Sequence, residues 1–424
     1  MHMITRSQAM APLAMAAALA LTAGCGALGQ AKPGQGKDAG GPITIGHLTP
    51  KSGFLGQLGA QDLAGAQFAV DEINGSGGLL GRQVKLISKD NVDPGVAVQN
   101  ATKLVETNHV DALFGEISTA SGLVIAGIAD RSKTVYFNTG WNSNLGRGKN
   151  CSPYVFHIDG NNTMYVSTVG LSVTKNTKAN KYYMLTADYA FGHDLRQESK
   201  LLLSTVKGTQ IVGDVLVPTG TSDYTTYIRR IQAAAPDTVW LNLAGSDQTT
   251  FLKQYTQEYG APYNLTGGIL DTPGAWAAGR KNIAGVWPNP YYHKLDTPKN
   301  KEFVTRYRKA HGNVPPSAQA WQSYIAVKIW AEGVKKAGTV EDAKVVEALR
   351  SGMEFDVLKK RPASFRKLDN QLMYDMEVVK VKAPGESAED QYDIFDIVEE
   401  VPGVGQNLEA IQIPAARSGC NMDK

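Results

Sequence analysis

Residues 43–88 read ITIGHLTPKSGFLGQLGAQDLAGAQFAVDEINGSGGLLGRQVKLIS, and this stretch decides the fold class. Apolar and polar side chains alternate over residues 43–48, as in a strand, and residues 49–59 form a polar loop punctuated by glycine. Apolar residues then recur at helical spacing at Leu63, Ala66, Val70 and Ile73. The glycine-rich residues 74–78 end that helix, and residues 83–88 predict a second strand. The stretch therefore predicts a strand, a helix and a strand in succession.

The same alternation of strands and helices continues along the chain. Further strands are predicted at residues 110–115, 134–137, 181–185, 210–216, 238–242 and 264–270. Helices are predicted at residues 94–108, 121–132, 164–174, 192–206, 224–235, 246–259, 300–310 and 321–337. This rhythm is typical of parallel sheets with right-handed crossovers. Because the pattern restarts after Gly160, we expect two Rossmann-like α/β lobes, with ligand sites beyond the carboxyl ends of the strands and a cleft between the lobes.

The N-terminus has the pattern of a lipoprotein export signal. Arg6 precedes an uncharged run over residues 10–23, which is too short to span a bilayer as a helix, and small residues precede Cys25 in LTAGC. We therefore expect residues 1–24 to be a signal peptide and Cys25 to become an acylated N-terminus that anchors the protein to a membrane. The alternative is an ordinary secretory signal with a chance cysteine. Residues 25–41 are rich in glycine and predict a flexible tether.

Composition and cysteine usage narrow the class of protein further. Roughly 380 residues remain after the tether, enough for two domains, and none of them form a segment that resembles a membrane span. The formal net charge is +3 with dispersed basic residues, so nucleic acid is not expected as a partner. Cys151 and Cys420 would meet oxidising conditions in an exported chain. A disulfide between them is expected, with two unrelated free thiols as the alternative.

Sequence patterns of enzymes are missing, and we expect neither catalysis, nor a metal, nor a cofactor. The seven histidines are scattered without metal-ligand spacing, and no G-x-S-x-G motif occurs. The glycine-rich residues 75–81 end a helix, whereas a dinucleotide-binding loop opens one after a strand. Asp188 and His193 lie five residues apart but have no nucleophile beside them in the sequence.

Several separated segments together resemble one family. They are GHLTP at residues 46–50, QFAVDEINGSGGLLGRQV at 67–84, DNVDP at 90–94, GEISTAS at 115–121, TADYAFG at 186–192 and NKEF at 300–303. In this order they resemble the solute-binding proteins of branched-chain amino acid type ABC transporters. The pair of cysteines and the TADYAFGH segment resemble the corresponding features of the subgroup that takes up amides, urea or aromatic acids.

The resemblance implies a type I periplasmic-binding fold, in which two lobes joined by three hinge crossings close on a small solute. The crossings are expected near residues 157–160, 286–290 and 364–369. The first lobe would then comprise residues 42–157 and 290–365, and the second lobe residues 158–289 and 366–424.

The resemblance also implies which residues hold the solute. Ser118 and Thr119 match the hydroxyl and backbone amides that bind a carboxylate, and a loop at the start of a helix favours an anion on physical grounds as well. Helix capping is the alternative for both hydroxyls. Phe191 matches an aromatic residue that closes over the ligand, and Asp271 is the nearest match to an acidic residue that faces a ligand amine. Phe54, Tyr189 and Trp141 are expected as apolar walls, with core packing as the alternative.

The loop at residues 140–142 departs from the family pattern. Gly140-Trp141-Asn142 stands where a small residue and a threonine are usual, and Trp141 is bulky where alanine is frequent. Asn142 can both donate and accept hydrogen bonds. These departures favour a flat or extended solute over an ordinary α-amino acid.

The expected function is that of an extracytoplasmic solute-binding component of an ABC importer. It would capture a small amino-acid-like, amide or aromatic carboxylate solute and deliver it to a permease and its ATPase, while the lipid anchor holds it at the outer face of the cytoplasmic membrane. The alternative is a lipoprotein that senses a ligand and signals to a membrane partner without transport. A structural envelope protein is a third class, disfavoured by the open cleft that the architecture implies.

Overall fold

The structure is a computed structural model that describes residues 40–176, 179–260, 263–383 and 389–422. The predicted signal peptide, the acylated Cys25 and all of the tether except Gly40 and Gly41 lie outside these ranges. Within the described ranges, no helix combines the length and the apolar character needed to cross a membrane.

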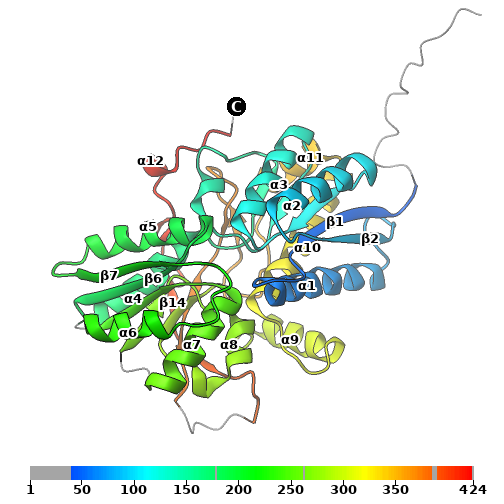
Figure 1. The fold of residues 1–424 in the computed structure, drawn as a ribbon. Coiled ribbons are helices and arrows are strands. Elements are labelled where there is room, and N and C mark those ends of the chain that lie inside the picture. Colours follow the sequence, from blue (N-terminus) through cyan, green and yellow to red (C-terminus); the bar gives the residue numbers. More distant parts are fainter. Residues whose placement is uncertain (1–39, 177–178, 261–262, 384–388, 423–424) are drawn as a thin grey trace, which may run out of the picture. The chain divides into compact units, whose positions relative to one another are not determined.

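The first lobe is built on a five-stranded parallel sheet with the strand order β2-β1-β3-β4-β5. Its strands are β1 (Ile43–Thr49), β2 (Val84–Asp90), β3 (Ala112–Gly115), β4 (Tyr136–Asn138) and β5 (Val155–His157). Its helices are α1 (Gly56–Gly75), α2 (Pro94–Thr102) with a π-helical continuation over Lys103–Thr107, α3 (Thr119–Ser132), α9 (Pro298–Ala310), α10 (Ala318–Ala337) and α11 (Asp342–Arg350). The blue and cyan elements in Figure 1 show this alternation of strands and helices.

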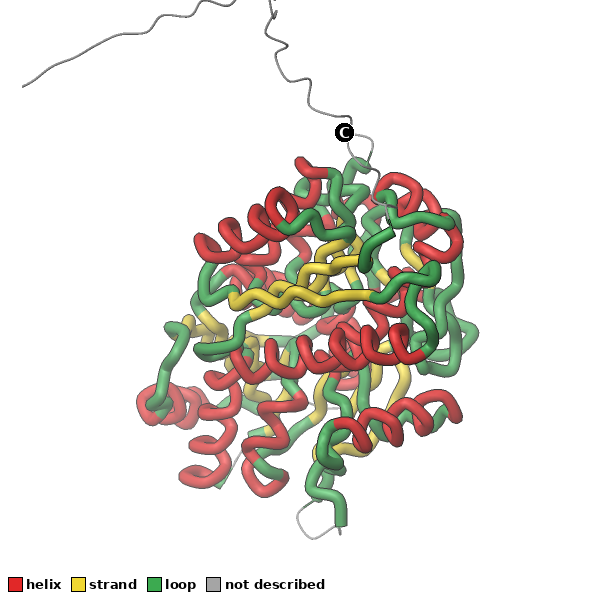
Figure 2. The backbone as a smooth tube through the Cα atoms, turned by 90° about the vertical axis from the view of Figure 1, so that its right-hand side faces the viewer, coloured by secondary structure: helices red, strands yellow, loops and turns green. Residues whose placement is uncertain are grey.

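The second lobe contains a four-stranded parallel sheet with the order β7-β6-β8-β9. Its strands are β6 (Lys181–Ala187), β7 (Gln210–Val217), β8 (Thr238–Asn242) and β9 (Asn264–Gly267). Its helices are α4 (Asn162–Asn176), α5 (Ala190–Ser204), α6 (Thr225–Ala234), α7 (Gly245–Tyr259) and α8 (Thr272–Ala278). In Figure 2, which faces the side of the first lobe, strands lie between helices. The predicted fold class, two α/β lobes with parallel sheets, is confirmed.

Antiparallel strands that the sequence did not predict complete the second lobe. They form a three-stranded sheet in the order β10-β13-β14, made of β10 (Val286–Asn289), β13 (Met376–Val381) and β14 (Phe395–Val401). A small hairpin of β11 (Ser364–Phe365) and β12 (Leu372–Met373) precedes β13. The Phe365 ring packs on Phe137 and Phe156 of the first lobe, with centroids 6.5 and 4.8 Å apart. This hairpin therefore packs on the first sheet, whereas β13 pairs within the second lobe.

The helix predicted from Leu63 begins seven residues earlier, at Gly56. The glycines in this region serve close packing instead of forming a loop. A Cβ atom on Gly59 would lie 1.8 Å from the Pro50 carbonyl oxygen, and one on Gly65 would lie 2.0 Å from the Ala320 carbonyl oxygen. Glycine therefore lets α1 lie directly against the loop after β1 and against α10, because no side chain separates the backbones.

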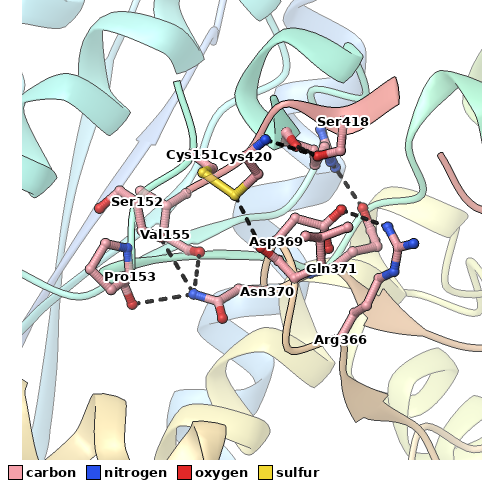
Figure 3. The surroundings of a disulfide bond; sticks show 12 residues. Cys151, Ser152, Pro153, Val155, Arg366, Asp369, Asn370, Gln371, Ser418 and Cys420 are labelled. Carbon is pink, nitrogen blue, oxygen red and sulfur yellow. Dashed lines mark hydrogen bonds and ion pairs between the residues drawn. A yellow bond between two sulfur atoms is a disulfide. The ribbon is translucent and has the colours of Figure 1, made fainter. Parts of the chain in front are cut away.

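The C-terminal segment returns to the first lobe after β14. It passes through short helices over Leu408–Ile411 and Ala415–Ser418 and ends beside the loop before β5, where Cys420 lies next to Cys151 (Figure 3). In the same place Asn370 Nδ2 donates to the carbonyl oxygens of Pro153 and Val155 at 3.2 and 3.1 Å. On the way Arg417 forms an ion pair with Glu198 of α5, with 2.7 Å between Nη1 and Oε1. The tail therefore contacts both lobes.

Candidate functional site

The loop between β3 and α3 is shaped by a buried glutamate. Glu116 has a left-handed backbone with φ of +79°, and its side chain turns back over its own loop. The carboxylate accepts hydrogen bonds from the Ile117 and Ser118 amides at 3.0 and 2.8 Å, and from Asn91 Nδ2 at 2.8 Å. Burial raises the pKa of Glu116 to about 7, although these hydrogen bonds act in the opposite direction. The amide of Ser118 is therefore occupied by a group of the protein itself.

The next residues offer unoccupied donors at the start of α3. Ser118 is the N-cap of the helix, but its side chain makes no capping hydrogen bond. The amides of residues 119–121 have no acceptor in the described part of the chain, as is usual for a first helical turn without a capping side chain. The predicted alternative, that the Ser118 hydroxyl caps the helix, is wrong. Of the two amides expected to be exposed, that of Ser118 is taken by Glu116 and that of Thr119 is free.

Thr119 adds a hydroxyl to these amides. Its side chain is fully buried, and Oγ1 has no hydrogen-bond partner among the described residues. A buried hydroxyl without a partner costs roughly 1–3 kcal/mol. Together with the positive end of the α3 dipole, this unpaired group can bind the oxygen atoms of an anion.

The loop after β4 places Trp141 in the core. The Asn138 side chain holds this loop by accepting from the Gly140 and Trp141 amides at 3.1 and 3.0 Å. The Trp141 ring is fully buried, and its Nε1 donates to the Tyr136 hydroxyl at 2.9 Å. A Cβ atom on Gly122 would lie 2.3 Å from that ring, so glycine is needed for α3 to pass over it. Trp141 thus packs as a core residue, the alternative that the sequence left open, and it is not placed as an apolar wall.

Gly140 and Asn142 flank Trp141 in this loop. A Cβ atom on Gly140 would lie 2.5 Å from Ile117 Cδ1, so glycine allows the loops after β3 and β4 to touch. Asn142 is buried, and its carbonyl oxygen accepts from the Asn162 amide at the start of α4 at 2.7 Å. Asn142 therefore sits where the first lobe meets the second.

Three of the predicted aromatic residues come together across the lobes. Phe54, in the loop after β1, meets Tyr189 edge to face with ring centroids 5.7 Å apart. Tyr189 in turn lies 5.5 Å from Phe191 in the first turn of α5. Phe191 is buried, whereas Phe54 and Tyr189 are partly exposed. This aromatic trio provides an apolar surface contributed by both lobes.

Asp271 lies beside the aromatic trio at the start of α8. Its carboxylate is buried, and Oδ2 accepts from the Gly245 amide at 2.7 Å. Burial raises the pKa of Asp271 to about 6, and the hydrogen bond from Gly245 opposes this shift only in part. Burial raises the pKa of the Tyr189 hydroxyl, and the negative charge of Asp271 acts in the same direction. Asp271 can therefore act as a hydrogen-bond acceptor with an adjustable charge.

Two further buried polar groups were not predicted from the sequence. His47 Nε2 lies 2.9 Å from Asp62 Oδ2, and Thr139 donates to the other Asp62 oxygen at 2.7 Å. Ser323 Oγ approaches the same His47 nitrogen at 3.5 Å, so the imidazole does not bridge a serine and an aspartate through its two nitrogens as a catalytic triad requires. His47 lies in β1 and Asp62 in α1, so neither residue has a local pattern that marks the pair. In the described ranges no group of three or more His, Cys, Asp or Glu is arranged to hold a metal ion.

Two open surface cavities in the described part of the chain lie away from the predicted residues. One of about 910 Å³ includes Thr238 and Lys380 in its lining, and one of about 840 Å³ lies between Lys299 and Lys360. Neither is lined by a predicted solute-binding residue. The predicted aromatic residues Phe54, Tyr189 and Phe191 instead meet where the lobes touch.

Known proteins share both sequence and fold with this chain. A family model described as periplasmic binding protein matches residues 42–388. The Leu/Ile/Val-binding protein homolog 7 of Brucella suis is 25% identical over 321 residues, which cover 72% of this chain and 80% of that protein. A branched chain amino acid ABC transporter periplasmic ligand-binding protein from Burkholderia xenovorans has a similar structure, with a TM-score of 0.77 and 25% identity over 90% of this chain and 100% of the other. An ABC transporter solute-binding protein from R. palustris in complex with benzoate has a TM-score of 0.74 and 21% identity over 85% of this chain and 98% of the other.

Proposed function

Because the chain belongs to the periplasmic binding protein family, we propose that it captures a small carboxylate-bearing solute between its lobes and delivers it to an ABC permease and its ATPase. Its relatives are binding proteins, and periplasmic binding proteins of ABC transporters are extracytoplasmic. The unpaired Thr119 hydroxyl at the free N-terminus of α3 is the single observation that carries the proposal. A buried donor without a partner is costly unless a ligand satisfies it.

The solute carboxylate would bind Thr119 Oγ1 and the amides of residues 119–121. Ser118, Gly140 and Asn142, in the loops after β3 and β4, would line the same site. The body of the solute would lie against Phe54, Tyr189 and Phe191, and a polar or amino group would face Asp271. The site thus suits an amino-acid-like, amide or aromatic carboxylate solute. The names of the Brucella and R. palustris relatives, which mention Leu/Ile/Val and benzoate, lie within this range.

Closure of the site requires a hinge, and we propose that three crossings provide it. The first follows β5 and the second follows β10, close to the predicted boundaries at residues 157 and 289. The third is better placed at residues 374–375 than at 364–369, since the hairpin of β11 and β12 packs on the first lobe while β13 pairs with β10. Gln371 Nε2 donates to the Asp159 carbonyl oxygen at 2.8 Å, so the first and third crossings support each other.

Two covalent features complete the proposal. Acylation of Cys25 after removal of residues 1–24 would hold the protein at the outer face of the cytoplasmic membrane. Pairing of Cys151 with Cys420, whose Cα atoms lie 5.6 Å apart, would fix the C-terminal tail in the oxidising envelope. Mass spectrometry of the exported protein tests both, through the acyl mass on Cys25 and the linked peptides of the disulfide.

A thermal-shift screen tests the solute class. The exported protein would be melted with L-leucine, L-glutamine, acetamide, urea and benzoate over a concentration series. A solute that binds only the folded state raises the melting temperature progressively as its concentration exceeds the dissociation constant. If no carboxylate in the series raises the melting temperature, the proposed carboxylate class is wrong.

A further inference from the structure

The N-terminus of α7 in the second lobe is capped by the backbone of the first lobe. The Ser246 amide donates to the Phe54 carbonyl oxygen at 3.0 Å. One residue earlier, the Gly245 amide donates to Asp271 Oδ2. Two of the first-turn amides of α7 therefore find acceptors outside the helix, and one of these acceptors belongs to the opposite lobe.

Glycine at position 245 is what permits this approach. Gly245 has φ of +59°, and a Cβ atom there would lie 2.2 Å from the Phe54 carbonyl oxygen and 3.3 Å from Leu55 Cδ2. Contacts of 2.2 Å between carbon and a backbone oxygen are not tolerated, so the two backbones would have to separate. A second bond lies nearby, where Gln57 Nε2 donates to the Pro273 carbonyl oxygen at 3.2 Å.

We propose that Gly245 is a positioning residue for solute capture, because the contact of its backbone with Phe54 determines how far the lobes close. We call the contacts of Phe54 and Gln57 with Gly245, Ser246 and Pro273 the closure latch. The inference rests on the proposed function and adds to it the element that limits closure.

The closure latch connects the two halves of the solute site. The Phe54 residue whose carbonyl caps α7 also places its ring on Tyr189. The Gly245 amide holds the Asp271 carboxylate that we expect to face the solute. Separation of Phe54 from Gly245 would thus move the Phe54 ring away from Tyr189 and open the aromatic trio. A solute would then escape more readily, since the closed state is the one that binds it.

The test compares Gly245→Ala with Gly338→Ala. Gly338 ends α10 with φ of +68°, and a Cβ atom there would meet nothing within 4 Å. Both substitutions place alanine in a left-handed conformation, so both lower the melting temperature, but only the first introduces a clash between lobes. Gln57→Ala is a third variant, which removes one bond of the closure latch from an exposed side chain without backbone strain.

The direct readout is amide hydrogen exchange of the full exported chain, measured on peptides that contain Ser246. We expect faster exchange in Gly245→Ala and, to a smaller extent, in Gln57→Ala, with wild-type exchange in Gly338→Ala. The second readout is the dissociation rate of the probe that shifts the melting temperature in the screen, L-leucine or benzoate. It should rise about tenfold or more in Gly245→Ala and stay unchanged in Gly338→Ala.

Wild-type exchange at Ser246 in Gly245→Ala overturns the closure latch. So does equal acceleration in Gly245→Ala and Gly338→Ala, since that result would reflect backbone strain alone. The exchange experiment needs no solute. Failure of every probe in the wild-type protein therefore counts against the proposed function, while the closure latch is still judged by the exchange of Ser246.

Discussion

Replacement of Thr119 by valine should move stability and solute binding in opposite directions. The two side chains have nearly the same shape, so Thr119→Val removes the hydroxyl and leaves the packing. Among the described residues Thr119 Oγ1 is buried without a hydrogen-bond partner, so its removal should relieve about 1–3 kcal/mol of desolvation cost. For a chain of this length we expect the melting temperature to rise by about 1–4 °C.

Binding should weaken in the same variant. A hydrogen bond to a charged carboxylate contributes roughly 1.5–3 kcal/mol, which corresponds to about a 10- to 150-fold increase in the dissociation constant. Thermal melts measure the change in melting temperature. Isothermal titration with the probe that responds in the screen measures the change in the dissociation constant.

Thr266→Val is the matched control. Thr266 is also buried, but its hydroxyl donates to the Val286 carbonyl oxygen at 2.8 Å and lies away from α3. This control should lose about 1 kcal/mol of stability and retain wild-type affinity. If Thr119→Val loses stability and keeps its affinity, the Thr119 hydroxyl has a structural role and the anion site is not where we place it.

Three other predictions concern the disulfide, Asp271 and Trp141. The double substitution of Cys151 and Cys420 by serine should lower the melting temperature under non-reducing conditions; the sequence separation of 269 residues sets an entropic limit of about 5 kcal/mol, and wild-type melting would mean that the bond is not formed. Asp271 has a folded-state pKa raised to about 6, so the folded protein binds more protons than the unfolded chain between pH 4 and 6, and stability falls as pH rises through that window. The free energy of unfolding of Asp271→Asn, relative to that of the wild-type protein, should therefore increase by roughly 3 kcal/mol from pH 4 to pH 7. Urea unfolding at each pH measures this difference, and a difference that stays constant with pH would contradict the burial of this carboxylate. Trp141→Phe should lose about 2 kcal/mol of stability, because it removes the hydrogen bond to Tyr136 and part of the ring volume, and it should keep its solute affinity. Weaker binding without a loss of stability would mean that Trp141 lines the solute pocket.

Most elements up to residue 337 could be predicted from sequence because they carry their own periodicity, whereas the short elements β5, α8 and β10 were missed. Residues 43–48 alternate and residues 63–73 repeat at helical spacing, so local pattern and final structure agree. The C-terminal strands could not be predicted in this way. Val286–Asn289 pairs with Met376–Val381, and that pairing depends on partners far apart in the chain.

The candidate site was predictable where a loop position alone implies a role. Thr119 at the start of a helix and Phe54, Tyr189 and Phe191 on loops at strand ends were predicted, and the structure brings the three aromatic residues together. Trp141 shows the limit of such reasoning. Its ring is accommodated by the missing side chains of Gly122 and Gly146, where a Cβ would lie 2.3 and 2.1 Å away. Such a fit between a large ring and glycines elsewhere in the chain cannot be recognised from the sequence around Trp141 alone.

The charge of Asp271 offers a way to separate the two classes of solute that the site admits. An amino acid brings an ammonium group that pairs with the ionised carboxylate, so its affinity should increase as pH rises through about 6 and then level off. A benzoate-like acid brings only negative charge and an apolar ring, and it is best accommodated while Asp271 is protonated, so its affinity should fall over the same range. The neighbouring hydroxyls of Tyr165 and Tyr189 have pKa values raised above their usual range by burial and do not titrate there. Glu116, in the loop that would hold the solute carboxylate, has a pKa raised to about 7 and also ionises near this range. Each probe is therefore titrated at pH 5 and pH 7 in the wild-type protein and in Asp271→Asn, and the difference between the two proteins should have opposite signs for the two classes. The same pH dependence in both proteins would mean that Asp271 does not face the solute.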